Sequence, residues 1–284
     1  MAGADATGTS YEAATLAADM VDYEGLRARQ AAQNVDGATK RLGIGVSSYF
    51  EMCGLAPSRV LASLNYSAGG WEAATVRVLP TNKIQVVTGT APHGQGHETA
   101  WSMIVAEKMG VDPDDVDVLH SDTAIAPLGL DTYGSRSLPV GGVAIALACD
   151  KVIDKAKKIA AHQLEANEDD LEFAGGNFTV KGSPDKAMPL AAIAFEAFTA
   201  HNLPDGMEPG LKETAFYDPS NFTFPAGAYV CEVDVDPGIS VRAGLYKIFH
   251  AIWASASGHI DEEIAVGAGK SPSSDPSERL AQLD

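Results

Sequence analysis

The sequence predicts an α+β protein in which helices pack against mixed sheets. Two patterns carry this prediction. Short β-type segments are joined by turn residues into hairpins, and helical segments of different lengths lie between them. The composition agrees, because 284 residues with 45% hydrophobic content can bury the core of one large domain or two small ones.

The N-terminal region predicts a helix over residues 10–34. Thr9 and Glu12 have the spacing of a capping box, in which each side chain bonds to a free main-chain donor at the helix start. The turn residues at 22–25 predict an interruption of this helix. Residues 43–52 are rich in β-formers and predict a strand, followed by a loop.

The middle of the chain predicts a hairpin that leads into a helix. The segments 74–79 and 84–88 are β-type and are separated by a turn containing Pro and Asn. The following helix ends at Gly110 because a glycine and then a proline terminate its apolar stripe. A strand over 116–120 comes next.

A long aperiodic segment, residues 121–139, precedes the longest predicted helix. Loops of this length are usually functional or disordered. After Gly142 a helix of about 25 residues is expected to pack on a sheet through one continuous apolar stripe, formed by Ile145, Cys149, Val152, Ala156 and Ile159. The remaining predicted elements are a hairpin over 171–180, a helix over 190–198 with Pro189 at its first position, and a strand over 228–236.

The predicted domain boundary lies at residue 237. Residues 1–237 are expected to form one domain, and 238–284 to form a divergent tail. Within that tail, residues 258–284 are polar, acidic and rich in Ser, Pro and Ala, which predicts disorder.

Charge and hydropathy exclude several kinds of partner. The formal net charge is −18, which repels nucleic-acid phosphates and anionic lipid. No stretch has the roughly 18 apolar residues of a membrane span, and no signal peptide is recognisable, so we expect a cytoplasmic protein. The three cysteines show no metal-ligand spacing and predict buried free thiols.

The segment 86–101 is the strongest candidate for a binding site. A β-type run passes through small residues into a helix, so Gly94 and Gly96 expose main-chain donors at the positive end of a helix dipole. This arrangement favours an anionic ligand.

Two other interpretations of this segment are weaker. A dinucleotide fingerprint would need a third glycine, and the preceding hairpin argues against a parallel strand–helix–strand start. A zinc pair formed by His93 and His97 is opposed by the glycines between them, and a solvated or ligand-facing loop histidine is expected instead.

A second candidate loop, residues 131–137, lies just before the longest helix. It contains several hydroxyl groups and the guanidinium of Arg136, all donors suited to phosphate or a polar heterocycle. An ordinary polar loop is the alternative. Together, the two loops favour a large phosphate-bearing cofactor held from two sides.

Three motifs together resemble one family. Gly43-Ile-Gly-Val-Ser-Ser-Tyr-Phe-Glu-Met-Cys-Gly-Leu-Ala-Pro-Ser58, Pro92-His-Gly-Gln-Gly-His-Glu-Thr99 and Thr132-Tyr-Gly-Ser-Arg-Ser137 occur in this order. They resemble the large, molybdopterin-binding subunit of aerobic carbon monoxide dehydrogenases, in the xanthine oxidase family of molybdenum hydroxylases. The resemblance covers roughly residues 10–236.

The resemblance implies a molybdopterin-binding domain with a defined set of contacts. The cofactor would be molybdopterin cytosine dinucleotide, held by Gly94, Gln95, Gly96, His97, Thr99, Thr132, Tyr133, Ser135 and Ser137. No protein ligand to the metal is implied. Copper is an option in the full enzyme, and FAD and 2Fe-2S centres are implied on a medium and a small partner subunit. The substrate would be carbon monoxide, an aldehyde or a heterocycle.

Two family features are not found. The loop with the active-site cysteine would precede Met1, and the loop with the active-site glutamate would follow Asp236, so no catalytic residue is assigned. The sequence after residue 238 also departs from the family, from which we expect an incomplete reading frame or gene fragment. A non-catalytic cofactor-binding or assembly module and a nucleotide-binding protein remain as alternatives.

Overall fold

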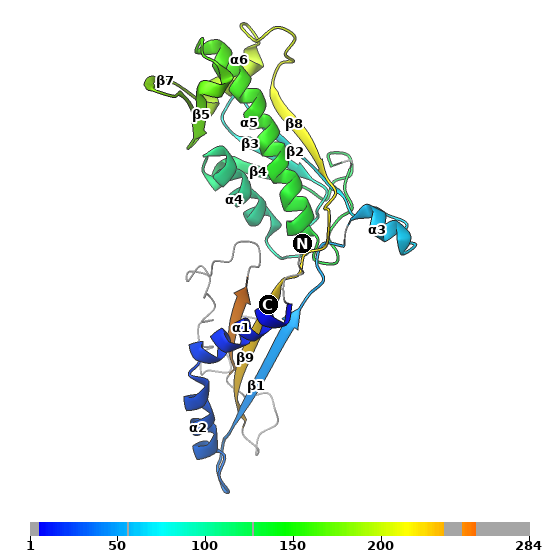
Figure 1. The fold of residues 1–284 in the computed structure, drawn as a ribbon, viewed down its shortest axis with the longest axis vertical. Helices are drawn as coiled ribbons and strands as arrows, with labels where there is room; N and C mark the ends of the chain where they lie inside the picture. The colour runs from blue at the N-terminus through cyan, green and yellow to red at the C-terminus, as the bar shows by residue number, and fades with distance from the viewer. Residues whose placement is uncertain (1–5, 56, 127, 236–245, 254–284) are drawn as a thin grey trace, which may run out of the picture. The chain divides into compact units, whose positions relative to one another are not determined.

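The protein divides into two compact units in the computed structural model, which describes residues 6–55, 57–126, 128–235 and 246–253 (Figure 1). The terminal unit comprises residues 1–52 and 224–284, and the central unit comprises residues 53–223. In the described ranges, no helix is long and apolar enough to cross a membrane.

The terminal unit is a three-stranded antiparallel sheet with two helices. The strand order is β1-β9-β10, and the elements are α1 (Ala6–Met20), α2 (Tyr23–Gln33), β1 (Arg41–Phe50), β9 (Ala226–Val235) and β10 (Tyr246–Trp253). Helix α1 packs on the sheet, mainly through β9. Its small core combines Ala13, Ala17 and Leu26 with Leu42, Ala228 and Val230.

Several predictions can be compared with this unit. The helix break is confirmed, because Asp22 adopts a left-handed conformation (φ 47°) and its carboxylate accepts a hydrogen bond from the Gly25 N–H. The capping box is wrong, since α1 begins at Ala6 and Thr9 lies inside it. Strand β10 was not predicted, and the predicted disorder over 258–284 lies outside the described residues.

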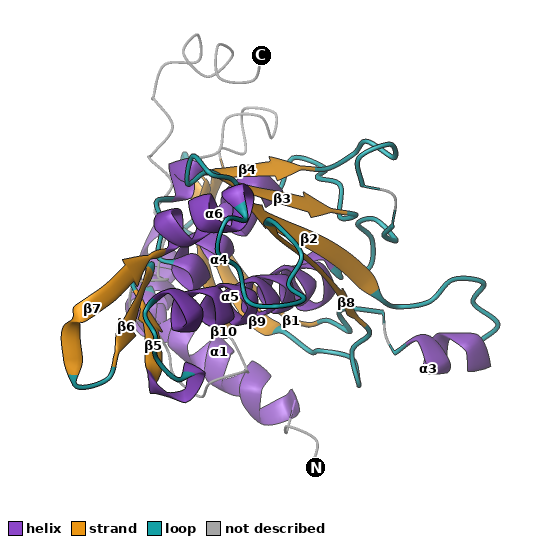
Figure 2. Ribbon diagram, turned by 90° about the horizontal axis from the view of Figure 1, so that it is seen from above, coloured by secondary structure: helices purple, strands orange, loops and turns teal. Residues whose placement is uncertain are grey.

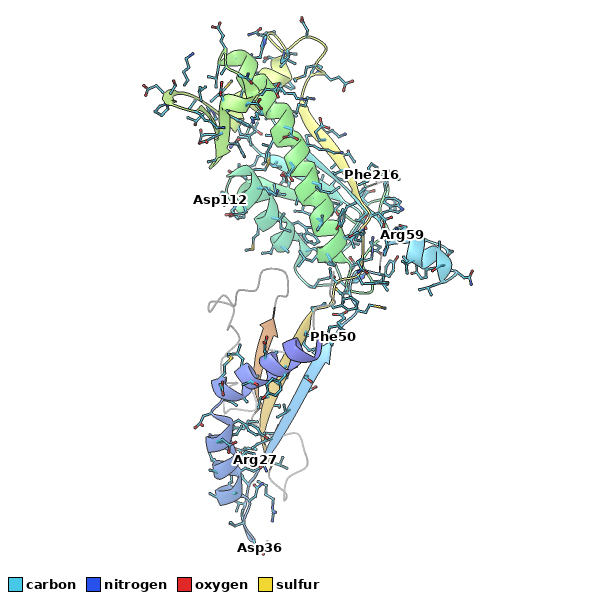
Figure 3. All side chains as sticks on the ribbon, in the orientation of Figure 1. Arg27, Asp36, Phe50, Arg59, Asp112 and Phe216 are labelled. Atoms are coloured by element: carbon cyan, nitrogen blue, oxygen red, sulfur yellow. The ribbon has the colours of Figure 1, made fainter. Side chains whose placement is uncertain are left out.

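The central unit is built on a four-stranded mixed sheet of order β4-β3-β2-β8. Its strands are β2 (Glu72–Val78), β3 (Ile84–Thr88), β4 (Val116–Leu119) and β8 (Leu211–Tyr217). Helices α4 (His97–Met109) and α5 (Val143–Gln163) pack together on one face (Figure 2). On β8, side chains alternate: Ala215 is buried, whereas its neighbour Phe216 is 56% exposed (Figure 3).

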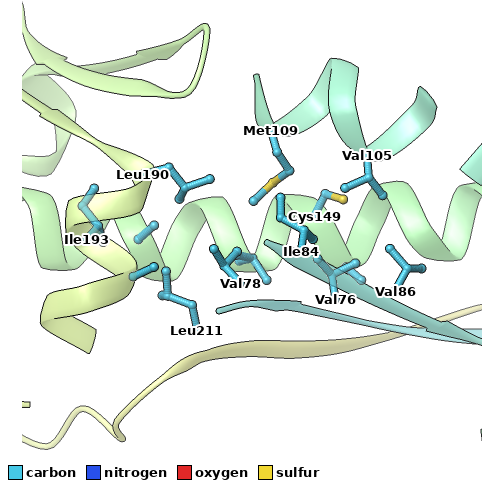
Figure 4. Packing of buried hydrophobic residues seen from close by; sticks show 14 of the residues in the cluster. Val76, Val78, Ile84, Val86, Val105, Met109, Cys149, Leu190, Ile193 and Leu211 are labelled. Carbon is cyan, nitrogen blue, oxygen red and sulfur yellow. The ribbon is translucent and has the colours of Figure 1, made fainter. Parts of the chain in front are cut away.

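The core of the central unit lies between this sheet and α5. The predicted apolar stripe of α5 is confirmed, because all five of its side chains are fully buried. They belong to the same buried hydrophobic cluster as Val76, Val78, Ile84 and Val86 of the sheet, and Figure 4 shows Cys149 near these side chains. Burying a valine or isoleucine side chain contributes about 1.5–3 kcal/mol, so this interface stabilises the unit.

A small α+β extension completes the central unit. It contains β5 (Leu171–Ala174), β6 (Asn177–Val180), β7 (Ser183–Pro189) and α6 (Leu190–Thr199). The predicted hairpin is confirmed, and β7 adds a third antiparallel strand to it. Pro189 is the residue before the helix rather than its first residue. Strands β7 and β8 and the short helix α3 (Ser58–Ser63) were not predicted.

Cys149 is expected to be inert in the native protein. Burial raises the pKa of its thiol to about 12, and the thiolate is the reactive form. At pH 8, iodoacetamide followed by peptide mass spectrometry should label Cys149 only after denaturation. Cys231 is partly exposed on β9 and is the internal comparison. Equal labelling rates for the two thiols in the native chain would contradict this expectation.

Candidate functional site

The first candidate loop connects β3 to α4 in a parallel strand–helix–strand unit. Strand β4 follows α4 and pairs with β3 in parallel, with Ile84 opposite Val116. The sequence argument that a hairpin replaces such a unit was therefore wrong: β2 and β3 form a hairpin, and β3 also begins a parallel unit. The loop lies at the carboxyl end of β3, where ligands commonly bind in parallel arrangements.

Two glycines shape the end of this loop. Gly94 and Gly96 have φ values of 98° and 78°, which side chains rarely tolerate. No atom lies within 4 Å of where a Cβ would stand on either glycine, so both face open space. Gly96 precedes the first turn of α4 without any side-chain cap. That turn therefore presents main-chain donors, including the N–H groups of His97 and Thr99, to an anion.

Gln95 is oriented by its own loop. Its Oε1 accepts a hydrogen bond from the His93 N–H, which leaves the side-chain NH₂ group to donate outward. The residue is exposed. Gln95 can therefore present a donor to a ligand.

His97 can offer only its main-chain N–H to a ligand, because its side chain is buried. Its ring is 4% exposed, and Nδ1 lies 3.3 Å from the Thr90 carbonyl, which can only accept, so that nitrogen carries a proton. The ring also packs on Trp101, with centroids 4.9 Å apart. The expectation of a solvated or ligand-facing ring is thus wrong for His97. It holds for His93, whose side chain is exposed.

A carboxylate beside the first turn is already engaged. Glu98 accepts a hydrogen bond from its own main-chain N–H, and its Oε1 lies 2.7 Å from His120 Nε2. Both contacts lower the pKa of Glu98, and the hydrogen bond from its own main chain has the larger effect. The Glu98 carboxylate is therefore held against the ring of His120, which follows the last residue of β4.

The second candidate loop lies directly against the first. The Ala91 N–H donates to Asp131 Oδ1 at 3.2 Å, and His93 Nε2 donates to the Thr132 carbonyl at 3.1 Å. The two candidate loops are therefore in direct contact. Tight backbone turns shape the second loop, since Asp131, Gly134 and Ser135 all have positive φ values.

Two hydroxyl groups of the second loop are hydrogen-bonded to each other. Thr132 Oγ1 and Ser137 Oγ lie 2.8 Å apart, and Ser137 begins a π-helical turn (Ser137–Gly142) that continues into α5. That turn has no side-chain cap at its start. Ser135 is exposed, whereas Ser137 is 8% exposed. The second loop thus leads into a helix start that has no side-chain cap.

A third segment supports this loop and was missed as part of the site. Cys53 Sγ donates to the Ser135 carbonyl at 2.7 Å, and the Gly54 N–H donates to the Gly134 carbonyl at 3.1 Å. Burial raises the pKa of Tyr133, and a hydrogen bond with the Tyr66 hydroxyl raises it further. The sequence signalled this segment only as a motif, without showing what it contacts.

Arg136 does not act as the sequence suggested. Its side chain is fully buried and bonds to Glu72 and to main-chain carbonyls, so it cannot donate to a phosphate in this loop. The remaining candidate donors are therefore main-chain N–H groups, the Gln95 amide and the hydroxyl groups of the second loop. The described ranges contain no group of three His, Cys, Asp or Glu residues that could hold a metal ion.

This donor set fits an anionic cofactor better than a catalytic centre. Two helix starts, two glycines facing open space and neutral donors can hold phosphate and polar ring edges. The geometry thus defines a cofactor-binding domain.

Sequence comparison identifies the domain. The model of the molybdopterin cofactor-binding domain family matches residues 16–252, and the chain belongs to this family. The predicted boundary at residue 237 lies inside the matched range. The chain is 43% identical over 231 residues to the carbon monoxide dehydrogenase large chain of Hydrogenophaga pseudoflava, covering 81% of this chain and 28% of the relative. It is 40% identical to that of Afipia carboxidovorans, with coverages of 82% and 29%.

Solved structures agree with this assignment. Reconstituted carbon monoxide dehydrogenase from Oligotropha carboxidovorans superposes with a TM-score of 0.73 at 37% identity, covering 85% of this chain and 30% of that chain. Quinoline 2-oxidoreductase from Pseudomonas putida 86 gives a TM-score of 0.72 at 34% identity, with the same coverages. The α+β prediction is confirmed, and the chain spans less than a third of the length of these relatives.

Proposed function

We propose that this chain holds molybdopterin cytosine dinucleotide in a carbon monoxide dehydrogenase-like molybdenum hydroxylase. The reaction would be oxidation of carbon monoxide, a small aldehyde or a heterocycle, with water as the oxygen source. One observation carries the proposal: the loops 92–99 and 131–137 are hydrogen-bonded to each other and together present two helix starts without side-chain caps. The family assignment supplies the type of cofactor.

The residues of this chain would bind and orient the cofactor. Main-chain N–H groups of the first turn of α4 would donate to phosphate oxygens, and the Gln95 NH₂ group to a polar edge of the cofactor. Thr132, Tyr133, Ser135 and Ser137 would contact its other side. The bound group supplies the redox chemistry, whereas the protein supplies position and hydrogen bonds.

The partners and the compartment are part of the same proposal. One relative is the large chain of its enzyme and another is a subunit of a dehydrogenase complex, which supports partner subunits for this chain. We propose that these are an FAD-binding medium subunit and an iron–sulfur small subunit. A solved relative is a copper- and molybdenum-containing carbon monoxide dehydrogenase, so the proposal includes copper as an option in the full enzyme. We place the chain in the cytoplasm. A purely assembly-related role is less favoured, because the relatives are oxidoreductases.

Two substitutions test the two-loop site. Gln95→Ala and Ser135→Ala each remove a proposed donor, and each should weaken cofactor binding by about 1–3 kcal/mol if its acceptor stays buried. Molybdenum per chain, measured by elemental mass spectrometry, and cytidine monophosphate released by acid should both fall. The matched controls are Gln85→Ala on β3 and Ser183→Ala on β7, which should retain the wild-type cofactor content.

The outcomes separate the proposals. Full retention of molybdenum and cytidine monophosphate in both site variants would reject the two-loop site. A wild-type chain that carries adenine nucleotide and no molybdenum would instead support a nucleotide-binding protein. Bound molybdopterin without turnover, even with partner subunits added, would support a non-catalytic module.

A further inference from the structure

The most unusual feature beside the site is a fully buried ion pair. Arg136 Nη1 lies 2.6 Å from Glu72 Oε2, and neither side chain is exposed. Burying two charges is costly, and replacing such a pair by apolar residues is often neutral or stabilising. Stability alone therefore gives no reason for this pair, and its contacts point to another role.

The guanidinium group of Arg136 bonds to the main chain on both sides of the pair. Nη1 also donates to the Asp131 carbonyl at 2.6 Å, at the start of the second loop. Nη2 donates to the carbonyls of Trp71 (2.6 Å) and Gly70 (3.4 Å), just before β2. The planar group thus connects the second loop to the entry of the central sheet. Lysine could not reproduce this fork of donors.

The carboxylate of Glu72 contacts the bases of both loops. Its Oε2 accepts from the Leu130 N–H at 3.2 Å. Its Oε1 lies close to both Gly89 and Gly129. A Cβ atom added to Gly89 would be 2.6 Å from this oxygen, and one added to Gly129 would be 2.4 Å from it. Gly89 follows β3 and leads into the first loop, and Gly129 leads into the second. Both backbones therefore close around one carboxylate.

We propose that Glu72 and Arg136 are a positioning pair that fixes residues 130–137 in their cofactor-binding conformation before any cofactor binds. Neither residue contacts the cofactor. The cofactor-related part of this inference rests on the proposed function. The pre-ordering of the loop is a property of the chain itself and can be tested without cofactor.

Hydrogen exchange on the cofactor-free full chain tests the pre-ordering. Glu72→Gln keeps the size of the side chain but removes its charge, and Arg136→Lys keeps the charge but removes the fork. In both variants, amides of Leu130 and residues 131–137 should exchange at least about tenfold faster, because bonds to charged groups are lost. Amides in the middle of α5 should keep their wild-type rates. The control is Arg77→Lys, at an exposed arginine on β2.

Cofactor retention separates positioning from general stability. Ile159→Val trims a fully buried side chain on α5 away from the loops, and serves as a destabilised reference. After loading with cofactor, Glu72→Gln and Arg136→Lys should lose molybdenum at least about tenfold faster than Ile159→Val, even where their Tm values match. If Arg136→Lys fails to fold, Glu72→Gln still provides both measurements.

Each result has a defined meaning. Unchanged exchange over 130–137 in both variants would overturn the proposal, whatever cofactor the chain binds. Faster exchange throughout the central unit, including α5, would assign the pair a purely structural role and would also overturn it. Selective loop exchange in a wild-type chain that binds no molybdenum would uphold the pre-ordering and reject the proposed function.

Discussion

Gly89→Ala is expected to destabilise the central unit by about 3 kcal/mol and to abolish cofactor retention, because the added methyl group overpacks a rigid contact. Its Cβ would stand 2.4 Å from the Gly129 Cα and 2.9 Å from the Leu128 carbonyl oxygen. Both are main-chain atoms, so neither can move without shifting the second loop. The Glu72 carboxylate would also be displaced from its place beside Gly89.

Urea unfolding followed by circular dichroism measures this loss, and molybdenum content measures the effect on the site. Gly45→Ala on β1 is the matched control, because no atom lies within 4 Å of its Cβ position and its backbone is not left-handed. A Gly89→Ala chain as stable as Gly45→Ala would show that the two loops can separate freely, contrary to the close approach of Gly89 and Gly129.

Trp101→Ala should cost about 3–5 kcal/mol of unfolding free energy, since a large core side chain leaves a cavity. Trp101 is 1% exposed and supports the ring of His97 at the start of α4. Losing this support should loosen the first turn that presents main-chain donors, so cofactor content should fall together with stability. Thermal unfolding and molybdenum content are the two measurements.

Two other variants define the cause. Met103 lies on the same helix and is 59% exposed, so Met103→Ala should change stability by less than about 0.5 kcal/mol. Trp101→Phe should lose less than Trp101→Ala, because Trp101 Nε1 has no hydrogen-bond partner among the described residues and the cavity is smaller. Equal losses in the Phe and Ala variants would contradict a packing role.

Sequence reasoning succeeded where the physics is local or periodic. The stripe from Ile145 to Ile159 predicted a buried helix face, since helical spacing alone decides which side chains share a face. Gly110 predicted the end of α4, where it adopts the left-handed conformation. Strand β8 escaped prediction, because three consecutive polar residues, Lys212, Glu213 and Thr214, hide its alternation in the sequence, and pairing with β2 is what makes it a strand.

For the candidate site too, the sequence predicted the local features but not the contacts between distant residues. The glycine positions and the hydroxyl-rich loop were predicted from residue types, and their resemblance to molybdopterin-binding subunits identified the family. The roles of His97 and Arg136 were not predicted, because a sequence shows that a side chain can donate but not which acceptor it meets after folding. Their acceptors are main-chain carbonyls and a carboxylate far away in the sequence.

The sequence by itself thus determined the α+β class, the long packed helix and the positions of the two candidate loops. Only the tertiary structure decided that these loops touch, and that a buried Glu72–Arg136 pair anchors the second loop to the start of β2. The physical reason is that helix faces and turns depend on neighbouring residues. Contacts between residues 64 positions apart depend instead on how the whole sheet assembles.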